Sequence, residues 1–81
     1  MLTELATQPK IVGAKQVRRA VEAGSALRVF LSEDADPRVT GPIRELCAQR
    51  GVAVEMVPSM RELGRACGIA VGSAVAALIR Q

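Results

Sequence analysis

The residues whose types are best suited to contact a ligand lie close together near the start of the chain, at Gly13, Lys15, Gln16, Arg18 and Arg19. They fall at the start of a predicted helix, where unpaired amides and about half a positive charge attract anions. A glycine at such a position lets the backbone of a ligand approach closely. Lys and Arg can donate to O6 and N7 of guanine, and Gln can read base edges. The pattern is typical of a nucleic-acid contact, and a solvated helix face is the alternative.

The residue combinations that most enzymes use are missing. The chain has no histidine, so it has no imidazole group to act as a base or as a metal ligand. None of its serines lies in a G-x-S-x-G turn, and neither a G-x-x-x-x-G-K-[ST] loop nor a G-x-G-x-x-G turn occurs. A chain this short also has a thin core, which leaves little room for an enclosed active site. We therefore expect no enzymatic activity and no cofactor.

Two sets of potential metal ligands are better explained in other ways. Glu33, Asp34 and Asp36 form an acidic cluster, but an acidic loop before a helix usually supplies a cap and solvated surface. Cys47 and Cys67 lack zinc-ligand spacing and lie on predicted apolar helix faces. A free cysteine in such a place behaves as a small hydrophobic residue. We expect no metal site and two buried free thiols.

Residues 59–72, SMRELGRACGIAVG, begin as a helix and end in an unusual loop. Ser59 and Glu62 fit a capping box, and Gly68 fits a left-handed stop. The inner face of this helix is expected at Met60, Leu63 and Cys67. The next three residues, Ile69–Val71, are apolar and lie between two glycines, so we expect a loop with flexible ends. Such a loop either fills the core of the protein or presents apolar surface to a partner.

Composition narrows the class of protein further. The chain has 81 residues, 49% hydrophobic and 23% charged, which suits one domain spanning 1–81. Its 11 Lys and Arg against 8 Asp and Glu give a net charge of +3, a modest bias toward anionic partners. Phe30 is the only aromatic residue, which argues against base stacking on aromatic rings. Because there is no secretory signal pattern and no apolar run of about 18 residues, we expect a cytoplasmic protein that does not enter membranes.

Hydrophobic spacing predicts strands that alternate with helices. The strands are expected at 10–12, 27–31, 52–57 and 74–79. Residues 27–31, LRVFL, are apolar nearly throughout, which is typical of a strand covered on both faces. This alternation predicts an α/β layered fold with a four-stranded mixed sheet.

The helices are bounded by glycine and proline signals. One is expected from Gly13 to about Ala23, with Gly24 as its stop and an inner face at Val17, Ala20, Val21 and Gly24. Asp36-Pro37 looks like a cap followed by a first-turn proline. Because Gly41-Pro42 would disturb a helix interior, we expect a single turn at 37–39 and a main helix at 40–50, with Gly51 as its end. Residues 1–8 are expected to form a short amphipathic helix or a frayed end.

Three segments carry a resemblance to a known family. They are GAKQVRR at 13–19, EDADP at 33–37 and LGRACGI at 63–69. In this order they resemble the kink-turn-binding ribosomal protein family, the L7Ae/L30e group, and especially its small bacterial members of the YbxF and YlxQ type. The resemblance covers nearly the whole chain, from about Ile11 to Ile79, and the third segment is its most distinctive part.

The resemblance implies a three-layer α/β/α sandwich that binds a kink-turn, a sharply bent RNA helix with tandem sheared G·A pairs and an extruded base. The positions that match the guanine-contacting helix start are Gly13, Lys15, Gln16 and Arg19. The positions that match the loop over the bulged bases are Ile69, Ala70 and Val71. Asp36 matches an acidic position near the extruded nucleotide in some members, and a helix cap is its other interpretation.

The sequence departs from the family pattern at a few positions. Lys15-Gln16 stands where archaeal and eukaryotic members have Asn-Glu, which removes an acceptor for guanine amino groups and adds a cation. Met60 stands where many relatives are basic, and Ala70 where many are polar.

Two functional hypotheses follow. The first is an RNA-binding protein that acts as a monomer, captures a kink-turn and is associated with the ribosome or another structured RNA, with Arg18 on a phosphate. The second is a protein-interaction module of a ribonucleoprotein particle that uses the 69–71 loop. The first requires this loop to lie beside the helix that starts at Gly13, which the sequence itself does not show.

Overall fold

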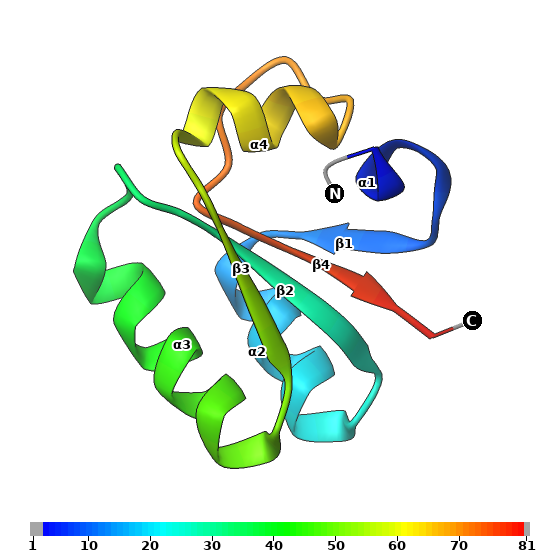
Figure 1. The fold of residues 1–81 in the computed structure, drawn as a ribbon, viewed down its shortest axis with the longest axis vertical. Helices are drawn as coiled ribbons and strands as arrows, with labels where there is room; N and C mark the ends of the chain where they lie inside the picture. The colour runs from blue at the N-terminus through cyan, green and yellow to red at the C-terminus, as the bar shows by residue number, and fades with distance from the viewer. Residues whose placement is uncertain (1–2, 81) are drawn as a thin grey trace.

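The order of helices and strands follows the predicted alternation. The structure is a computed structural model, and it describes residues 3–80. Its elements, shown in Figure 1, are α1 (Glu4–Thr7), β1 (Lys10–Val12), α2 (Ala14–Ala23), β2 (Ala26–Ser32), α3 (Pro37–Arg50), β3 (Ala53–Val57), α4 (Met60–Ala66) and β4 (Val75–Ile79). The first two residues of the predicted 1–8 helix lie outside the described residues.

The four strands form one mixed sheet in the order β1-β4-β2-β3. β2 and β3 are parallel, whereas β4 runs antiparallel to both β1 and β2. Val12 is opposite Ala76, Leu31 is opposite Val75, and Ser32 is opposite Val57. The carboxyl ends of β1, β2 and β3 therefore meet the amino end of β4 at one edge of the sheet. We call this the loop edge, because the 69–71 loop leads into β4 there.

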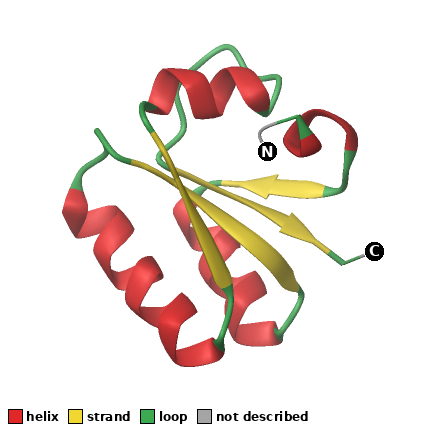
Figure 2. Ribbon diagram, viewed as in Figure 1, coloured by secondary structure: helices red, strands yellow, loops and turns green. Residues whose placement is uncertain are grey.

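Helices cover both faces of the sheet, which confirms the three-layer α/β/α fold (Figure 2). Because side chains alternate along a strand, Val29 and Leu31 pack with α2 and α3, whereas Phe30 packs with α1 and α4. Strand β4 behaves in the same way, with Val75 and Ala77 on the first face and Ala76 and Leu78 on the second. Each face of the sheet thus has its own apolar core.

Two details of the predicted inner faces were wrong. Gly24 is exposed and ends α2 in a left-handed conformation, with φ of 79°, so it continues no apolar face. Leu27 is 48% exposed, at an irregular pairing between β2 and β4, so the start of β2 is not covered on both sides. The predicted burial of Val17, Ala20 and Val21 is confirmed.

The predicted break between a turn at 37–39 and a helix at 40–50 was also wrong. Helix α3 is continuous from Pro37 to Arg50, with Pro42 inside it. The amides of Arg38, Val39 and Thr40 are all bonded to Asp36, through its side chain or its carbonyl. The hydrogen bond that Pro42 removes is the one that its own nitrogen would have donated to the carbonyl of Arg38. Both residues are exposed, so water can replace that bond.

The two cysteines are buried and free, as predicted. Cys47 belongs to the core under α2 and α3, and Cys67 to the core under α1 and α4. Burial raises the pKa of both thiols, and the charge of Lys10 partly opposes this effect at Cys67. Within residues 3–80, no helix has the length and apolar character needed to cross a membrane, and no three acidic, Cys or His side chains gather as a metal site.

Candidate nucleic-acid interface

The amino end of α2 lies at the loop edge and has no side-chain cap. Gly13 precedes it with φ of 110° and ψ of 144°, a conformation that side chains on L-residues rarely adopt. The Gly13 amide donates to the carbonyl of Val75 at 3.0 Å, and the Gly13 carbonyl accepts from Val17 at 3.0 Å. Among the described residues, the amides of Ala14, Lys15 and Gln16 donate to no acceptor within hydrogen-bond distance. This helix end is therefore open to an external anion.

The polar side chains of the first turns of α2 are all exposed: Lys15, Gln16, Arg18 and Arg19. Gln16 folds back toward Gly13, because a Cβ placed on that glycine would lie 2.8 Å from the Gln16 Oε1 atom. Lys15 and Arg18 instead line a groove of about 310 Å³ between α2 and α3, together with Arg38. The structure thus separates two polar regions: the Gln16 side-chain amide lies at the helix start, and the cations Lys15 and Arg18 lie in the groove.

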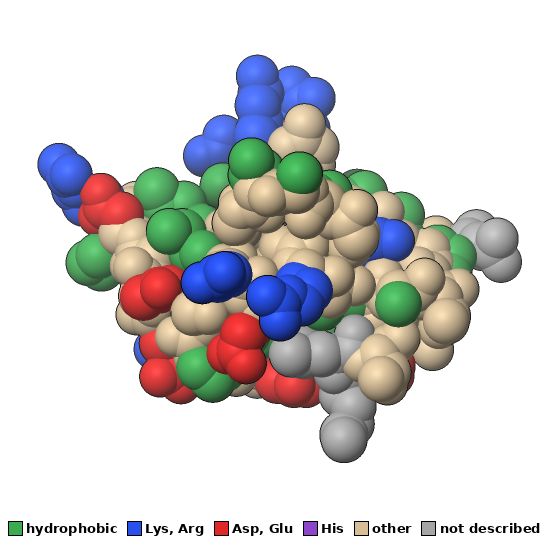
Figure 3. All heavy atoms as spheres, turned by 90° about the horizontal axis from the view of Figure 1, so that it is seen from above, with side chains coloured by type: hydrophobic (Ala, Val, Ile, Leu, Met, Phe, Trp, Pro, Cys, Tyr) green, Lys and Arg blue, Asp and Glu red, His purple; other side chains and the backbone are tan. Residues whose placement is uncertain are grey.

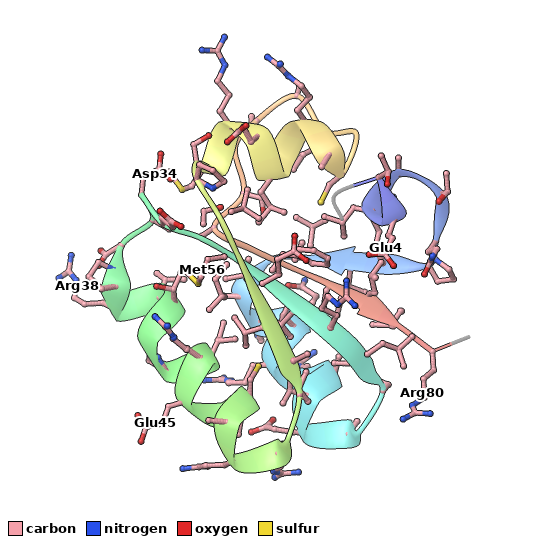
Figure 4. The ribbon with its side chains drawn as sticks, viewed as in Figure 1. Glu4, Asp34, Arg38, Glu45, Met56 and Arg80 are labelled. Atoms are coloured by element: carbon pink, nitrogen blue, oxygen red, sulfur yellow. The ribbon has the colours of Figure 1, made fainter. Side chains whose placement is uncertain are left out.

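The amino ends of α3 and α4 lie at the same edge, but the chain caps them itself. Asp36 accepts from the Arg38 amide at 2.9 Å and pairs with its guanidinium at 2.9 Å. This guanidinium, followed by the amide, lowers the pKa of the Asp36 carboxyl. Helix α4 is capped by Ser59, which accepts from Glu62 at 3.1 Å, and by Asp34, which accepts from Met60 at 2.8 Å. Figure 4 shows Asp34 beside the start of α4 and Arg38 at the start of α3. The cap interpretation of Asp36 is therefore correct, and its contact with RNA stays a prediction.

The apolar loop 69–71 presents its side chains to solvent. Ile69 is 38% exposed and Val71 is 70% exposed, so neither fills the core. The loop is nevertheless held on α4, because the Ile69 amide donates to Gly64 at 3.1 Å and the Ser73 amide to Met60 at 3.0 Å. One end of the loop is closely packed, since a Cβ added at Gly72 would lie only 3.1 Å from the Met60 Cβ atom. The expected flexibility of the loop ends stays a prediction.

Two buried serines fasten the end of this loop to the sheet. The Ser32 hydroxyl donates to the Ser73 carbonyl at 2.7 Å, and the Ser73 hydroxyl donates to the Val75 carbonyl at 2.8 Å. The Ser32 amide also donates to Ala74 at 3.0 Å. These bonds leave no buried side-chain polar atom unpaired within the described residues. The loop therefore has a fixed position relative to β2 and β4.

The loop and the α2 amino end are brought to the same edge. Val71 is four positions from Val75, so its Cα lies within about 14 Å of the residue that accepts from Gly13. In Figure 1 the segment after α4 descends to the start of β4, beside the junction of β1 and α2. Figure 3, seen from above α4, shows Lys and Arg side chains on both sides of a ridge that carries hydrophobic side chains. Asp36 lies at this edge too, at the start of α3.

Sequence reasoning missed three residues that matter at this edge. Gly64 is buried inside α4, and a Cβ there would overlap the carbonyl oxygen of Val71. A glycine inside a helical pattern was the available signal for such a close contact. Arg61 and Arg65 line a second groove of about 310 Å³ with residues 69–72. Their i, i+4 spacing, which puts both on one helix face, was the signal for them.

Together these features define a small α/β/α protein whose sheet edge joins an uncapped, basic helix start to an exposed apolar loop. The chain belongs to the ribosomal protein L7Ae/L30e/S12e/Gadd45 family, whose model matches residues 3–81. This membership confirms the predicted resemblance.

Relatives with curated descriptions extend over most of the chain. An RNA-binding protein of Geobacillus sp. is 46% identical over 70 residues, which cover 86% of this chain and 85% of that protein. The RNA-binding protein YbxF of Geobacillus stearothermophilus is 39% identical, with the same coverage. The large ribosomal subunit protein eL8 of Halobacterium salinarum is 40% identical, covering 83% of this chain and 57% of that protein. These descriptions are not enzymatic, in agreement with the prediction that the chain is not an enzyme.

A solved structure supports the fold assignment. The 15.5 kD RNA-binding protein of Giardia lamblia superposes with a TM-score of 0.89 and 29% identity, covering 99% of this chain and 68% of that chain.

Proposed function

We propose that this protein binds structured RNA through the loop edge and that its target is a kink-turn. The observation that carries the proposal is the hydrogen bond from Gly13 to Val75, because it joins the uncapped α2 end to the strand that the apolar loop enters. The RNA-binding relatives and the family resemblance support the same interpretation.

Helix α2 supplies the polar half of the interface. Its open amides and the cations Lys15 and Arg18 attract phosphate groups, and their exposure leaves them accessible. Gln16 and Arg19 are one turn apart and can contact the edges of the guanines in sheared G·A pairs. Gln16 carries both a donor and an acceptor, so it can meet either kind of base atom.

The loop 69–71 supplies the apolar half. RNA-binding proteins recognise unstacked bases at distorted sites, often on aromatic rings. Phe30, the only aromatic residue, is fully buried, so the exposed Ile69 and Val71 would cover the extruded base instead. A surface that fits the bent RNA better than the extended RNA shifts the population toward the bent form.

A gel-shift panel tests this proposal. It compares a kink-turn RNA, the same RNA with its G·A pairs replaced, and a plain duplex. We expect the tightest binding to the kink-turn, because only this RNA presents the bent backbone with an extruded base. Equal binding to all three RNAs would contradict the kink-turn proposal, although it would leave RNA binding in place.

A protein-interaction module is the second candidate, because Val71 is 70% exposed on an apolar loop. Binding to purified kink-turn RNA, with no other protein present, favours the first candidate. Association with the ribosome, a monomeric state and a cytoplasmic location remain predictions for this chain.

A further inference from the structure

We propose that Arg61 and Arg65 form a second phosphate-binding surface, on the far side of the apolar loop from α2. This inference rests on the proposed RNA-binding function and extends the footprint of the RNA onto the outer face of α4. The expected ligand is the sugar-phosphate strand that continues past the unstacked base.

The two arginines and the loop share one groove. Arg61 and Arg65 are four positions apart in α4, so their Cβ atoms are about 5–6 Å apart on one face of the helix. Both are exposed, and they line a groove of about 310 Å³ together with Ile69–Gly72. One wall of this groove is cationic, and the other carries the exposed side chains of Ile69 and Val71.

The charges of these arginines are not used within the described part of the protein. Four of the other arginines have partners there: Arg28 pairs with Glu4, Arg38 pairs with Asp36, and Arg50 and Arg80 donate to backbone carbonyls. No ion pair or hydrogen bond of residues 3–80 involves the guanidinium of Arg61 or Arg65. Glu62 lies between them in sequence and forms no ion pair with either one. An anion in the groove would therefore displace no internal partner.

The placement of the groove matches the path of an RNA strand. The loop lines this groove and continues into the strand to which the α2 amino end is bonded, and Figure 3 shows basic side chains on both sides of a ridge that carries hydrophobic side chains. A strand that crosses the loop would meet cations before and after its unstacked base. The close packing of Gly64 against Val71 fixes the distance between the arginines and the loop, so both walls can act on one ligand.

The proposal is tested by measuring the affinity for the kink-turn RNA at several salt concentrations. The variants are Arg61→Gln, Arg65→Gln and the double variant. Each lost phosphate contact should lower the slope of log affinity against log salt by about 0.7–0.9. The advantage of the wild type over the double variant should then shrink about 7- to 12-fold between about 50 and 200 mM salt. The matched control is Arg44→Gln, an exposed arginine of α3 on the opposite face of the sheet, which should keep the wild-type slope.

Discrimination against the RNA with replaced G·A pairs should be retained in the double variant, because phosphate contacts carry no base information. A double variant with the slope of the wild type would overturn the inference while leaving the kink-turn proposal intact. Failure of the wild type itself to prefer the kink-turn would overturn the proposed function, and this inference with it.

Discussion

The amino ends of α2 and α3 lie at the same edge of the sheet, yet only one of them is open. At α3, the Asp36 carboxylate receives the Arg38 amide at 2.9 Å, so the chain provides its own anion. At α2, Gly13 has no side chain to offer, and the next three amides have no acceptor among residues 3–80. The comparison teaches that the chain supplies its own anion at the start of α3 and leaves the start of α2 open, where we propose that RNA binds.

Backbone conformation maintains this difference. The φ of 110° at Gly13 is strained for any residue with a Cβ, so a capping side chain is not readily introduced there. Asp36 has an extended conformation, with φ of −61° and ψ of 122°, which suits a cap with a side chain.

The largest expected effect comes from displacing the loop from α4, on which it is held. Gly64→Ala would place a Cβ against the Val71 carbonyl and force α4 and the loop apart. We expect a loss of about 1–3 kcal/mol in the free energy of unfolding, together with weaker binding to kink-turn RNA. Thermal unfolding and a gel shift measure these two effects.

The control for this variant is Gly41→Ala. Gly41 is also inside a helix, but nothing lies within 4 Å of its added Cβ. This change should raise stability by about 0.4–1 kcal/mol, because alanine restricts the unfolded chain. Equal losses in both variants would show that the contact between Gly64 and Val71 is unimportant.

The open end itself is probed by Gln16→Ala and Lys15→Ala. Gln16→Ala should cost about 1–3 kcal/mol of binding free energy, through the loss of a contact with a base edge. Lys15→Ala should weaken binding mainly through the loss of a phosphate contact. Stability should be unaffected, since both side chains are exposed. Isothermal titration with a kink-turn RNA measures the cost, and wild-type affinity in both variants would show that the assignment of the helix start is wrong.

Removing a cap from α4 should lower the stability of the protein and leave its discrimination between RNAs unchanged. Ser59→Ala removes the acceptor for the Glu62 amide and should cost about 1 kcal/mol of unfolding free energy. Chemical denaturation measures this loss. A marked change in discrimination between G·A and replaced pairs would contradict the division between open and capped ends.

Arg18 should contribute through charge alone. Its side chain lines the groove between α2 and α3 and would contact a phosphate. We expect Arg18→Ala to lower the salt slope of RNA binding by about 0.7–0.9 and to keep base discrimination. A salt titration with an unchanged slope would argue against a phosphate contact.

The smallest expected effect is on the stability of the protein at low pH. Because Arg38 lowers the pKa of Asp36, the ionised cap contributes stability above the ordinary pKa of 3.8, and this contribution is lost as pH falls through the lower folded value. Asp36→Asn keeps a capping side chain but does not titrate. Melting temperatures of the two proteins should therefore respond differently as pH falls below about 4, with the wild type losing more. Parallel curves would show that the pairing with Arg38 has no energetic effect.

Much of the fold could be predicted from local signals. Glycine stops, the Asp36-Pro37 cap and apolar spacing indicated the elements, because each acts over only a few residues. The Gly41-Pro42 pair was misleading, because α3 continues through Pro42 despite the lost hydrogen bond, after a first turn that Asp36 caps.

The site was less predictable because it depends on contacts between distant segments. Lys15 and Gln16 could be selected by type and spacing, but their proximity to residues 69–71 arises from the register of β1 and β4. The contact of Gly64 with Val71 likewise requires the loop to fold back on its own helix. Arg61 and Arg65 are ordinary surface residues until this loop provides the second wall of their groove.

The buried bond from Ser32 to Ser73 has a consequence for the thermodynamics of complex formation. Since this bond anchors the end of the 69–71 loop, little conformational entropy of the protein would be lost if the loop binds RNA as we propose. The ordering cost of association then falls mainly on the nucleic acid, whose intrinsic tendency to bend would set the affinity differences among its targets.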